Sequence, residues 1–502
     1  MKHLPSDFFT TTGQSVTTNK WDTVAAIHIS ELNAAIAQAG TSPPGFEALA
    51  QKAISVSARF GAWRILPDSD GPTLSMELPL TDITLTDHGQ TRHYDTGRAM
   101  VDVHLELLPH DPNEKGDTRL FLLVVKLRAE RAHRHAAEVT RVELDDTGGV
   151  VDQAYVMMAL GQWLDQNLHQ FTQVFATVNI HKVVDQNAAF AWLKPTHVAY
   201  AFGYNARDPE QSVLGVLCQT GGRSADGLIY QVEADAIPPG TRAAYLISKR
   251  RYLRDMLGGA LPRAFEGLEA DNIKYAGDDT GLSIKHTAHL KEIENDGKKY
   301  DPDLVKLDVD LGETELSVFS ITKTKIVPGV YSVCTSTGHY GFGLIKRKSG
   351  GKTLGYYETQ PFKSENSTEK TKGAVITEII LGIIAAIAGL LLWLGTFGTS
   401  TLVMGALYIA LVGSIGTITA MEIAELVGEG DGPPVDMLVA NATDAVTFAT
   451  GTKFDPTVAG LNGALQIGGT YTADPALRTA AGATPAAAFQ ARFATRMQER
   501  AP

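Results

Sequence analysis

The sequence contains little cysteine: Cys218 and Cys334 are its only two thiols in 502 residues. So few thiols exclude a disulfide-stabilised scaffold and a cysteine-rich zinc module. Positive charge is also scarce, because 44 Lys and Arg residues stand against 56 Asp and Glu residues and leave a net charge of −12. This balance argues against a nucleic-acid partner, since affinity for nucleic acid depends on neutralising phosphates. With 44% hydrophobic and 20% charged residues, the chain is expected to fold around a core.

The first twenty residues have no apolar stretch and no small-residue cleavage site, so they carry no recognisable export signal. We therefore expect a cytoplasmic protein. Membrane association and export without a cleavable signal are the alternatives.

Motifs for catalysis and metal binding are missing as well, including Gly-x-Ser-x-Gly and the Walker sequence. His286 and His289 have the spacing of metal ligands, but their segment alternates like a strand and favours surface positions. Asp68 begins a stretch like a calcium loop, whose twelfth position is Pro79 instead of Glu. The glycine-rich residues 338–343 favour a bulged or closely packed strand over a phosphate loop. We expect no enzyme activity, no cofactor, no metal site, and buried thiols that are not nucleophiles.

Alternation of apolar and polar residues predicts many strands. Residues 101–107 alternate strictly, residues 119–127 form a more buried run, and the turn between them contains Pro and Gly, which together predict a hairpin. Further strands are predicted at 198–203, 213–219, 228–233, 282–290, 304–311, 316–322, 329–335 and 461–468. The turn signals between them favour antiparallel meanders.

Helical periodicity is confined to a few segments. Residues 30–39 predict a short helix, and residues 152–175 and 248–265 predict long amphipathic helices, the last ended or kinked by Pro262. We interpret the basic run 249–251 as a solvated helix face, with binding to anionic lipid as the alternative. Many strands and a few long helices predict an α+β fold.

Seven short packing and turn signatures are spread between Trp21 and Tyr471. They are residues 21–27 (WDTVAAI), 60–65 (FGAWRI), 174–179 (VFATVN), 191–196 (AWLKPT), 213–218 (VLGVLC), 245–248 (YLIS) and 461–469 (LNGALQIGG). In these signatures the chain resembles the 47-kilodalton and OrfX-like proteins of clostridial neurotoxin gene clusters, in the TULIP (tubular lipid-binding) superfamily. The resemblance implies highly curved antiparallel sheets, each wrapped around a long amphipathic helix and leaving an apolar tube.

The resemblance also implies a domain organisation, with a boundary near residues 238–240. We predict an N-terminal tail (1–20), a first TULIP-like unit (21–240), a second unit (241–475) that contains an apolar helical hairpin (375–426), and an Ala/Arg-rich tail (476–502). The side chains expected to line the apolar tube are Tyr155, Leu160, Trp163, Leu164, Phe171, Tyr252, Met256 and Leu257.

The tail has an amphipathic pattern. Phe489, Phe493 and Met497 recur at i, i+4 and i+8, and arginines occupy another face. A docked helix and a frayed tail both fit this pattern.

The most unusual segment is residues 379–421, which contain no charged residue across 43 positions. Residues 379–397 and 402–421 would each span about 28–30 Å as a helix, which is the thickness of a bilayer core. Three interpretations remain open: a transmembrane hairpin, favoured by the net charge of +4 over residues 346–372; a hairpin held against the protein and released onto membranes; and a buried core hairpin. The candidates for membrane contact are Ile379, Ile383, Leu390, Leu391, Trp393, Leu394, Phe397, Leu402, Leu407, Tyr408 and Leu411.

Three functions follow from these observations. The first is a non-enzymatic lipid-binding or membrane-associating protein with an apolar tube and a membrane-engaging hairpin, whose partner is lipid or a membrane surface. The second is an accessory scaffold that assembles with a toxin or another protein encoded nearby and carries no lipid. The third is a membrane-inserting, pore-forming effector.

Overall fold

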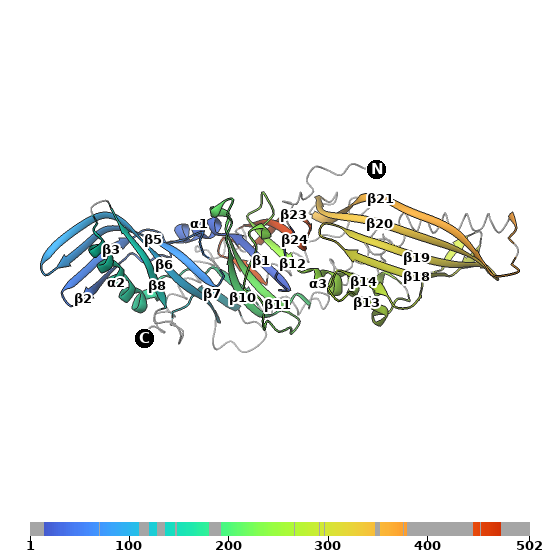
Figure 1. The fold of residues 1–502 in the computed structure, drawn as a ribbon, viewed down its shortest axis with the longest axis horizontal. Helices are drawn as coiled ribbons and strands as arrows, with labels where there is room; N and C mark the ends of the chain where they lie inside the picture. Colours follow the sequence, from blue (N-terminus) through green and yellow to red (C-terminus); the bar gives the residue numbers. More distant parts are fainter. Residues whose placement is uncertain are drawn as a thin grey trace, which may run out of the picture.

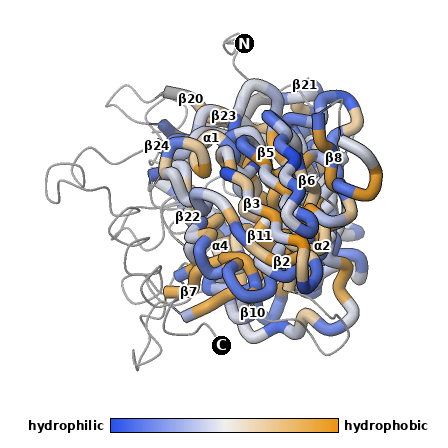
Figure 2. The backbone as a smooth tube through the Cα atoms, turned by 90° about the vertical axis from the view of Figure 1, so that its left-hand side faces the viewer, coloured by the Kyte–Doolittle hydropathy of each residue, from blue (hydrophilic) through white to orange (hydrophobic). Residues whose placement is uncertain are grey.

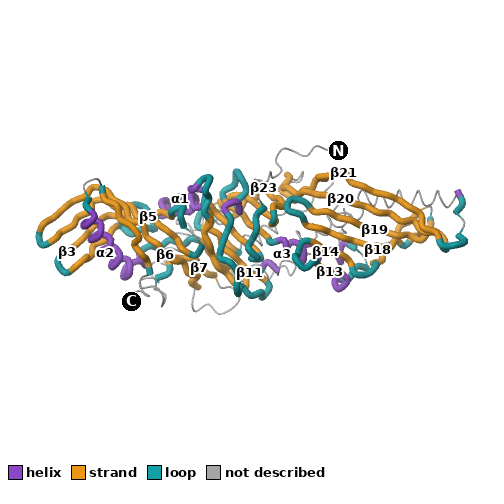
Figure 3. The backbone as a smooth tube through the Cα atoms, viewed as in Figure 1, coloured by secondary structure: helices purple, strands orange, loops and turns teal. Residues whose placement is uncertain are grey.

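In the described part of the chain, three large antiparallel sheets follow one another along the long axis of the molecule (Figure 1), and a two-stranded sheet accompanies them. The computed structural model describes residues 15–69, 71–109, 120–127, 136–145, 148–179, 192–265, 267–290, 292–295, 297–346, 352–374, 376–378, 445–451 and 453–472. We call the nine-stranded sheet the first wing, the six-stranded sheet the central sheet, and the seven-stranded sheet the second wing. Strands dominate and helices are few (Figure 3), so the predicted α+β class is confirmed as a sheet-dominated form.

The first wing has the strand order β2-β3-β5-β6-β7-β9-β22, with β4 paired to β5 and β8 to β6. Its strands are β2 (Gly45–Gln51), β3 (Ile54–Phe60), β4 (Arg64–Ile65), β5 (Thr73–Asp87), β6 (Gln90–Pro109), β7 (Leu120–Val125), β8 (Ala137–Leu144), β9 (Ala176–Asn179) and β22 (Val446–Phe448). Seen from the end of this wing, hydrophobic and hydrophilic stretches alternate along β5 and β6 (Figure 2). The predicted pairing of 101–107 with 119–127 is confirmed, since Leu105 lies opposite Val125.

The central sheet has the order β10-β11-β1-β12-β24-β23. Its strands are β1 (Thr23–His28), β10 (Pro195–Gly203), β11 (Val213–Thr220), β12 (Ala243–Ile247), β23 (Lys453–Asn462) and β24 (Ala464–Thr472). The predicted boundary near residue 240 falls between β11 and β12, and both of these strands pair with β1. The division into two TULIP-like units stays a prediction.

The second wing has the order β13-β14-β18-β19-β20-β21, with β15 paired to β18. Its strands are β13 (Ile273–Tyr275), β14 (Gly281–Ile284), β15 (Ala288–His289), β18 (Pro302–Leu311), β19 (Leu316–Val327), β20 (Val330–Lys346) and β21 (Lys352–Lys370), and beside them β16 (Ile293–Asn295) pairs with β17 (Lys298–Tyr300). The register of β20 against β21 shifts between Thr337 and Tyr340. Of the two alternatives predicted for residues 338–343, a bulged or a closely packed strand, the structure shows a bulge.

The helices follow the predicted periodicity, with one clear error. They are α1 (Ile29–Ala39), α2 (Val150–Asn167), α3 (Lys249–Arg251), the π-helix η5 (Tyr252–Gly258), α4 (Gly259–Ala264) and the 3₁₀ turns η1 (Leu168–Gln170), η3 (Pro209–Gln211), η4 (Ala234–Ala236) and η6 (Ala270–Asn272). The prediction that the second helix continues to residue 175 is wrong. The amide of Thr172 donates to the carbonyl of Thr41, and the amide of Phe175 donates to that of Leu123, so this backbone bonds to other segments instead of to the preceding turn.

The strand predicted at 228–233 is wrong. This segment is a loop over the outer face of the central sheet, where Val232 packs into a buried cluster. Its carbonyls accept from side chains: Trp21 Nε1 donates to Ile229 and Asn19 Nδ2 to Gln231. Side-chain donors thus replace the ladder that a strand would need.

Two other predicted strands are interrupted by turns. Residues 461–468 include a hairpin turn at Gly463, whose φ of 77° places it in the left-handed region that suits glycine. Residues 282–290 divide into β14 and β15, because the amides of Lys285 and His286 donate to Asn272 Oδ1 between them.

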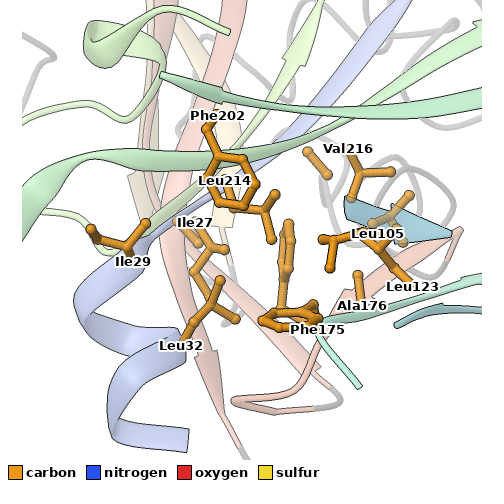
Figure 4. Packing of buried hydrophobic residues seen from close by; sticks show 14 of the residues in the cluster. Ile27, Ile29, Leu32, Leu105, Leu123, Phe175, Ala176, Phe202, Leu214 and Val216 are labelled. Carbon is orange, nitrogen blue, oxygen red and sulfur yellow. The ribbon is translucent and has the colours of Figure 1, made fainter. Parts of the chain in front are cut away.

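One contiguous apolar cluster extends from the first wing through the central sheet into the second wing. Figure 4 shows the junction of the first wing with the central sheet, where side chains of β1, α1, β6, β7, β9, β10 and β11 meet. Ile27, Leu32 and Phe175 are buried there. The cores of the two sheets are therefore continuous.

Candidate functional site

The first core lies between α2 and the sheet of the first wing, with α2 packed against β2, β3 and β8. Of the predicted tube residues, Leu160, Trp163 and Leu164 are buried here, and Tyr155 is partly buried against the same cluster. The 3.6-residue period of the helix brings these side chains to one face.

The N-terminal end of α2 is fixed by polar contacts in this otherwise apolar core. The hydroxyl of Tyr94 donates to Asp152, and Arg92 Nη2 lies 3.2 Å from Asp152 Oδ1. Burial, together with the carboxylate of Asp152, raises the pKa of Tyr94 to about 12, so the hydroxyl stays protonated and donates at neutral pH. These contacts fix the N-terminal end of α2 against β6.

A chain of aromatic rings continues this core toward the central sheet. Trp163 lies 5.5 Å from Phe60 between ring centroids, and Phe60 meets Trp63 edge-on at 5.3 Å. Trp63 stacks on the predicted tube residue Phe171 at 4.7 Å. Phe46 joins from β2 at 5.5 Å from Phe60. Phe46, on β2, and Trp63, just before β4, are core residues that the sequence-based site prediction missed, because neither belongs to a helical repeat of apolar residues.

The second core lies where the helical segment α3-η5-α4 meets the second wing. Tyr252, Met256 and Leu257 are all fully buried on η5, as their helical spacing predicts. The ring of Tyr252 meets Phe342 of β20 in a T-shaped contact at 6.3 Å. Phe342 is a second-wing partner that the sequence-based site prediction also missed.

The structure therefore brings the predicted tube residues of both helices into the same apolar cluster. Each core also holds one buried donor, Trp63 Nε1 in the first and Tyr252 Oη in the second, for which the described part of the chain offers no hydrogen-bond partner. An unpaired buried donor costs roughly 1–3 kcal/mol. That these side chains enclose an open tube stays a prediction.

The basic run Lys249–Arg251 connects the second core to the central sheet. Arg251 is 8% exposed, and its Nη2 donates to Asp22 Oδ2 at 3.0 Å while its Nη1 donates to Asp255 Oδ2 at 2.8 Å. Arg250 pairs with Asp279 at 3.1 Å. The prediction of a solvated basic face is wrong for Arg251, which is buried. Lys249 and Arg250 are partly exposed and pair with carboxylates of the same chain.

Asp22 is the centre of this network and has no exposed surface. It also accepts hydrogen bonds from the amide and hydroxyl of Thr220 and from Arg223 Nη1. Gly221, with φ of 63°, lets the guanidinium approach closely, since a Cβ there would lie 2.9 Å from Arg251 Nη2. The network joins the start of β1, the end of β11 and the helical segment.

Comparison with known proteins shows how this architecture is classified. Residues 18–469 match the OrfX-like family, described as "Protein OrfX2/OrfX3/P47". The chain belongs to the OrfX-like family. The resemblance to OrfX-like proteins seen in the sequence is thereby confirmed.

Relatives of this OrfX-like chain match it along almost their whole length. Protein OrfX3 of Paraclostridium bifermentans is 27% identical over 489 residues, covering 91% of this chain and 99% of the relative. Protein OrfX3 of Clostridium botulinum (strain Kyoto / Type A2) is 28% identical over 492 residues, covering 90% and 98%. The structure of P47 from Clostridium botulinum A2 superposes with a TM-score of 0.65 at 14% identity, covering 91% of this chain and 98% of that one. At that identity the P47 structure supports the fold of this OrfX-like chain and nothing finer.

The predicted membrane-contact residues, from Ile379 to Leu411, lie outside the described residues, as do the hairpin as a whole and the tail at 476–502. Of the helices in the described ranges, none combines the length and apolar character needed to cross a bilayer.

The chemical groups considered for catalysis occupy ordinary positions in this OrfX-like chain. Burial raises the pKa of the Cys218 thiol to about 12 and raises that of Cys334, so both stay protonated at neutral pH. Both cysteines are buried and free, as predicted. His286 and His289 are exposed, also as predicted.

His28 makes the stability of the junction between the first wing and the central sheet depend on pH. It is buried at the start of α1, and its Nδ1 donates to the carbonyl of Gln211 at 3.0 Å. Burial outweighs the carboxylates of Glu31 and Asp208 and lowers the pKa of His28. The unfolded chain therefore binds this proton more readily, so the stability contributed by neutral His28 is present above about pH 6.5 and is lost as the pH falls.

We expect His28→Asn to be less stable than the wild type near pH 7, with a gap that narrows toward about pH 5. Thermal unfolding across this range measures the gap. The exposed His286→Asn serves as control and should follow the wild type throughout. A gap of constant size would show that His28 does not titrate in this window.

Proposed function

We propose that this OrfX-like protein is a non-enzymatic accessory protein that binds lipid in the apolar cores of its two wings. The observation that supports this proposal is the pair of buried, unpaired donors, Trp63 Nε1 and Tyr252 Oη, each set among the predicted tube residues of its core. An ester or carboxyl oxygen at the head of an acyl chain would accept a hydrogen bond from either donor. Burial of the chain itself would contribute about 0.8 kcal/mol per methylene.

The membrane-engaging part of the proposal rests on sequence alone. Residues 379–421 carry no charge, and the net positive segment before them suits the surface of an anionic membrane. In this proposal the wings hold lipid, and the uncharged segment brings the protein to the membrane from which the lipid comes.

Native mass spectrometry of the purified full-length chain, combined with analysis of its organic extract, tests lipid binding. We expect bound lipid in the wild type and roughly fivefold weaker retention in Tyr252→Phe, because the variant loses one hydrogen bond worth about 1 kcal/mol. Tyr245→Phe is the matched control, since Tyr245 is an equally buried tyrosine of the central sheet whose hydroxyl interacts with Thr23. It should retain lipid like the wild type.

A wild-type protein that is free of lipid in every extract would contradict the proposal. Equal lipid retention by the wild type and Tyr252→Phe would show that the Tyr252 hydroxyl does not contribute to lipid binding. Liposome flotation of the full chain and of a variant that lacks residues 379–421 tests the membrane part separately. Loss of flotation on deletion is the expected result.

An accessory scaffold is the second candidate, and one observation favours it. Ile229 and Tyr230 are exposed apolar side chains on the loop that covers the central sheet. Tyr230 lies edge-on over the buried ring of Trp21 at 5.7 Å, which holds it in place. Aromatic side chains held rigidly at a surface are common centres of protein interfaces. Lipid-free protein that does not float, yet captures a protein encoded nearby through this loop, would favour the scaffold.

A further inference from the structure

The outward face of α2 is apolar although it faces solvent. Val150 is 81% exposed and Val151 is 63% exposed, and Ala154 and Met158 continue the same face one and two turns further along. These positions follow the i, i+3, i+7 spacing that a helix uses for a buried stripe. The opposite stripe of α2 already packs on the first wing, so this second stripe is free to receive another element.

The charge of α2 limits what could bind there. The helix contains two acidic residues, Asp152 and Asp165, and no basic residue. Asp152 is engaged at the start of the helix, and Asp165 lies two turns beyond Met158. A complementary element would be amphipathic, with an apolar stripe about two turns long and basic side chains beside it.

We propose that the C-terminal segment 476–502 of this chain docks on the outward face of α2. Phe489, Phe493 and Met497 form an apolar stripe that would be about 12 Å long on a helix, against about 10.5 Å from Val151 to Met158. The segment contains four arginines and one glutamate, so its charge complements that of α2. Its sequence thus supplies both properties that the face requires.

The path of the chain permits this docking. The described part of the C-terminal strand ends at Thr472, next to Tyr471, whose ring meets Phe448 at 5.5 Å. Phe448 belongs to β22, which pairs with β9 in the same wing as α2. Thirty residues follow Thr472. At roughly 3.3 Å per extended residue, the stretch before Phe489 spans more than the length of α2.

The docking is independent of lipid binding, and the native thiols make it testable. Because Cys218 and Cys334 are both buried, a new cysteine is the only accessible thiol. We introduce Val151→Cys into the full chain and into a chain that ends at residue 475, and measure the rate of labelling by a maleimide. The rate should rise at least about tenfold on truncation. Val305→Cys, at an exposed apolar position of the second wing, is the matched control and should label equally in both chains.

A full-length variant guards against a truncation that disturbs the fold. Phe489→Ser, Phe493→Ser and Met497→Ser together should reproduce the faster labelling. The matched triple Ala487→Ser, Ala488→Ser and Ala494→Ser, which leaves the stripe intact, should not. Equal labelling of Val151→Cys in all of these chains would overturn the proposal. A dimer that truncation converts to a monomer would also overturn it, because the segment would then dock on a second copy.

Discussion

Replacing Asp22 with alanine is expected to lower the free energy of unfolding by about 3–5 kcal/mol. The carboxylate is fully buried and accepts hydrogen bonds from Thr220, Arg223 and Arg251. Its removal leaves Asp255 as the carboxylate that still pairs with the 8%-exposed guanidinium of Arg251 among the described residues. A buried charge that loses a partner keeps its desolvation cost, which is why the effect is large.

Urea denaturation followed by tryptophan fluorescence measures this effect, since Trp21 precedes Asp22 directly. Glu292→Ala is the matched control. Glu292 pairs with Lys299 at 2.7 Å, but both side chains are exposed, so its loss should cost less than about 1 kcal/mol. Similar losses for the two variants would mean that the buried network contributes no more than a surface ion pair.

The Asp22 network connects several elements, so its loss is expected to affect more than one sheet. Asp22 precedes β1, Thr220 ends β11, and Arg251 closes α3 at the entrance to the second core. Lys249 and Arg250 extend the contacts to Glu313 and Asp279 in the turns of the second wing. Weakening the centre therefore loosens both the central sheet and the attachment of the second wing.

Local patterns in the sequence predicted much of this fold. Residues 307–311 alternate strictly, and they lie in β18 with Leu307, Val309 and Leu311 buried. The period of residues 248–265 likewise placed Tyr252, Met256 and Leu257 on one buried face. In both segments the structure is decided by a repeat of apolar residues within the segment itself, so a short stretch of sequence is enough to predict it.

The errors occur where a distant residue decides the structure. Arg251 looked like part of a solvated basic face, but its partner Asp22 is 229 positions away in the sequence. Residues 228–233 have the apolar composition of a strand, but Trp21 Nε1 donates to the carbonyl of Ile229 and helps to hold the segment as a loop. Neither contact can be predicted from the residues that neighbour it in the sequence. The site shows the same division, because helical spacing found Trp163 but not the strand residues that surround it.

Phe171→Ala is the second variant with a large expected effect, a loss of about 3–5 kcal/mol in the free energy of unfolding. Phe171 is fully buried, stacks on Trp63 at 4.7 Å and meets Phe175 at 6.3 Å. Truncation removes the ring that links these two aromatic residues and leaves a cavity. Tyr204→Ala, which truncates an exposed aromatic residue, is the control and should change stability by no more than about 0.5 kcal/mol.

The same variant connects stability to the proposed function. The cavity would lie in the core that is proposed to hold an acyl chain, so a bound chain could fill part of the lost volume. We therefore expect the loss in Phe171→Ala to be largest in delipidated protein and smaller after lipid is added back, as measured by thermal unfolding in both states. Asp22→Ala creates no cavity in this core, so added lipid should raise the stability of this variant no more than that of the wild type. If Phe171→Ala is equally destabilised with and without lipid, the acyl chain does not reach this aromatic cluster, and lipid binding would have to be sought in the second core.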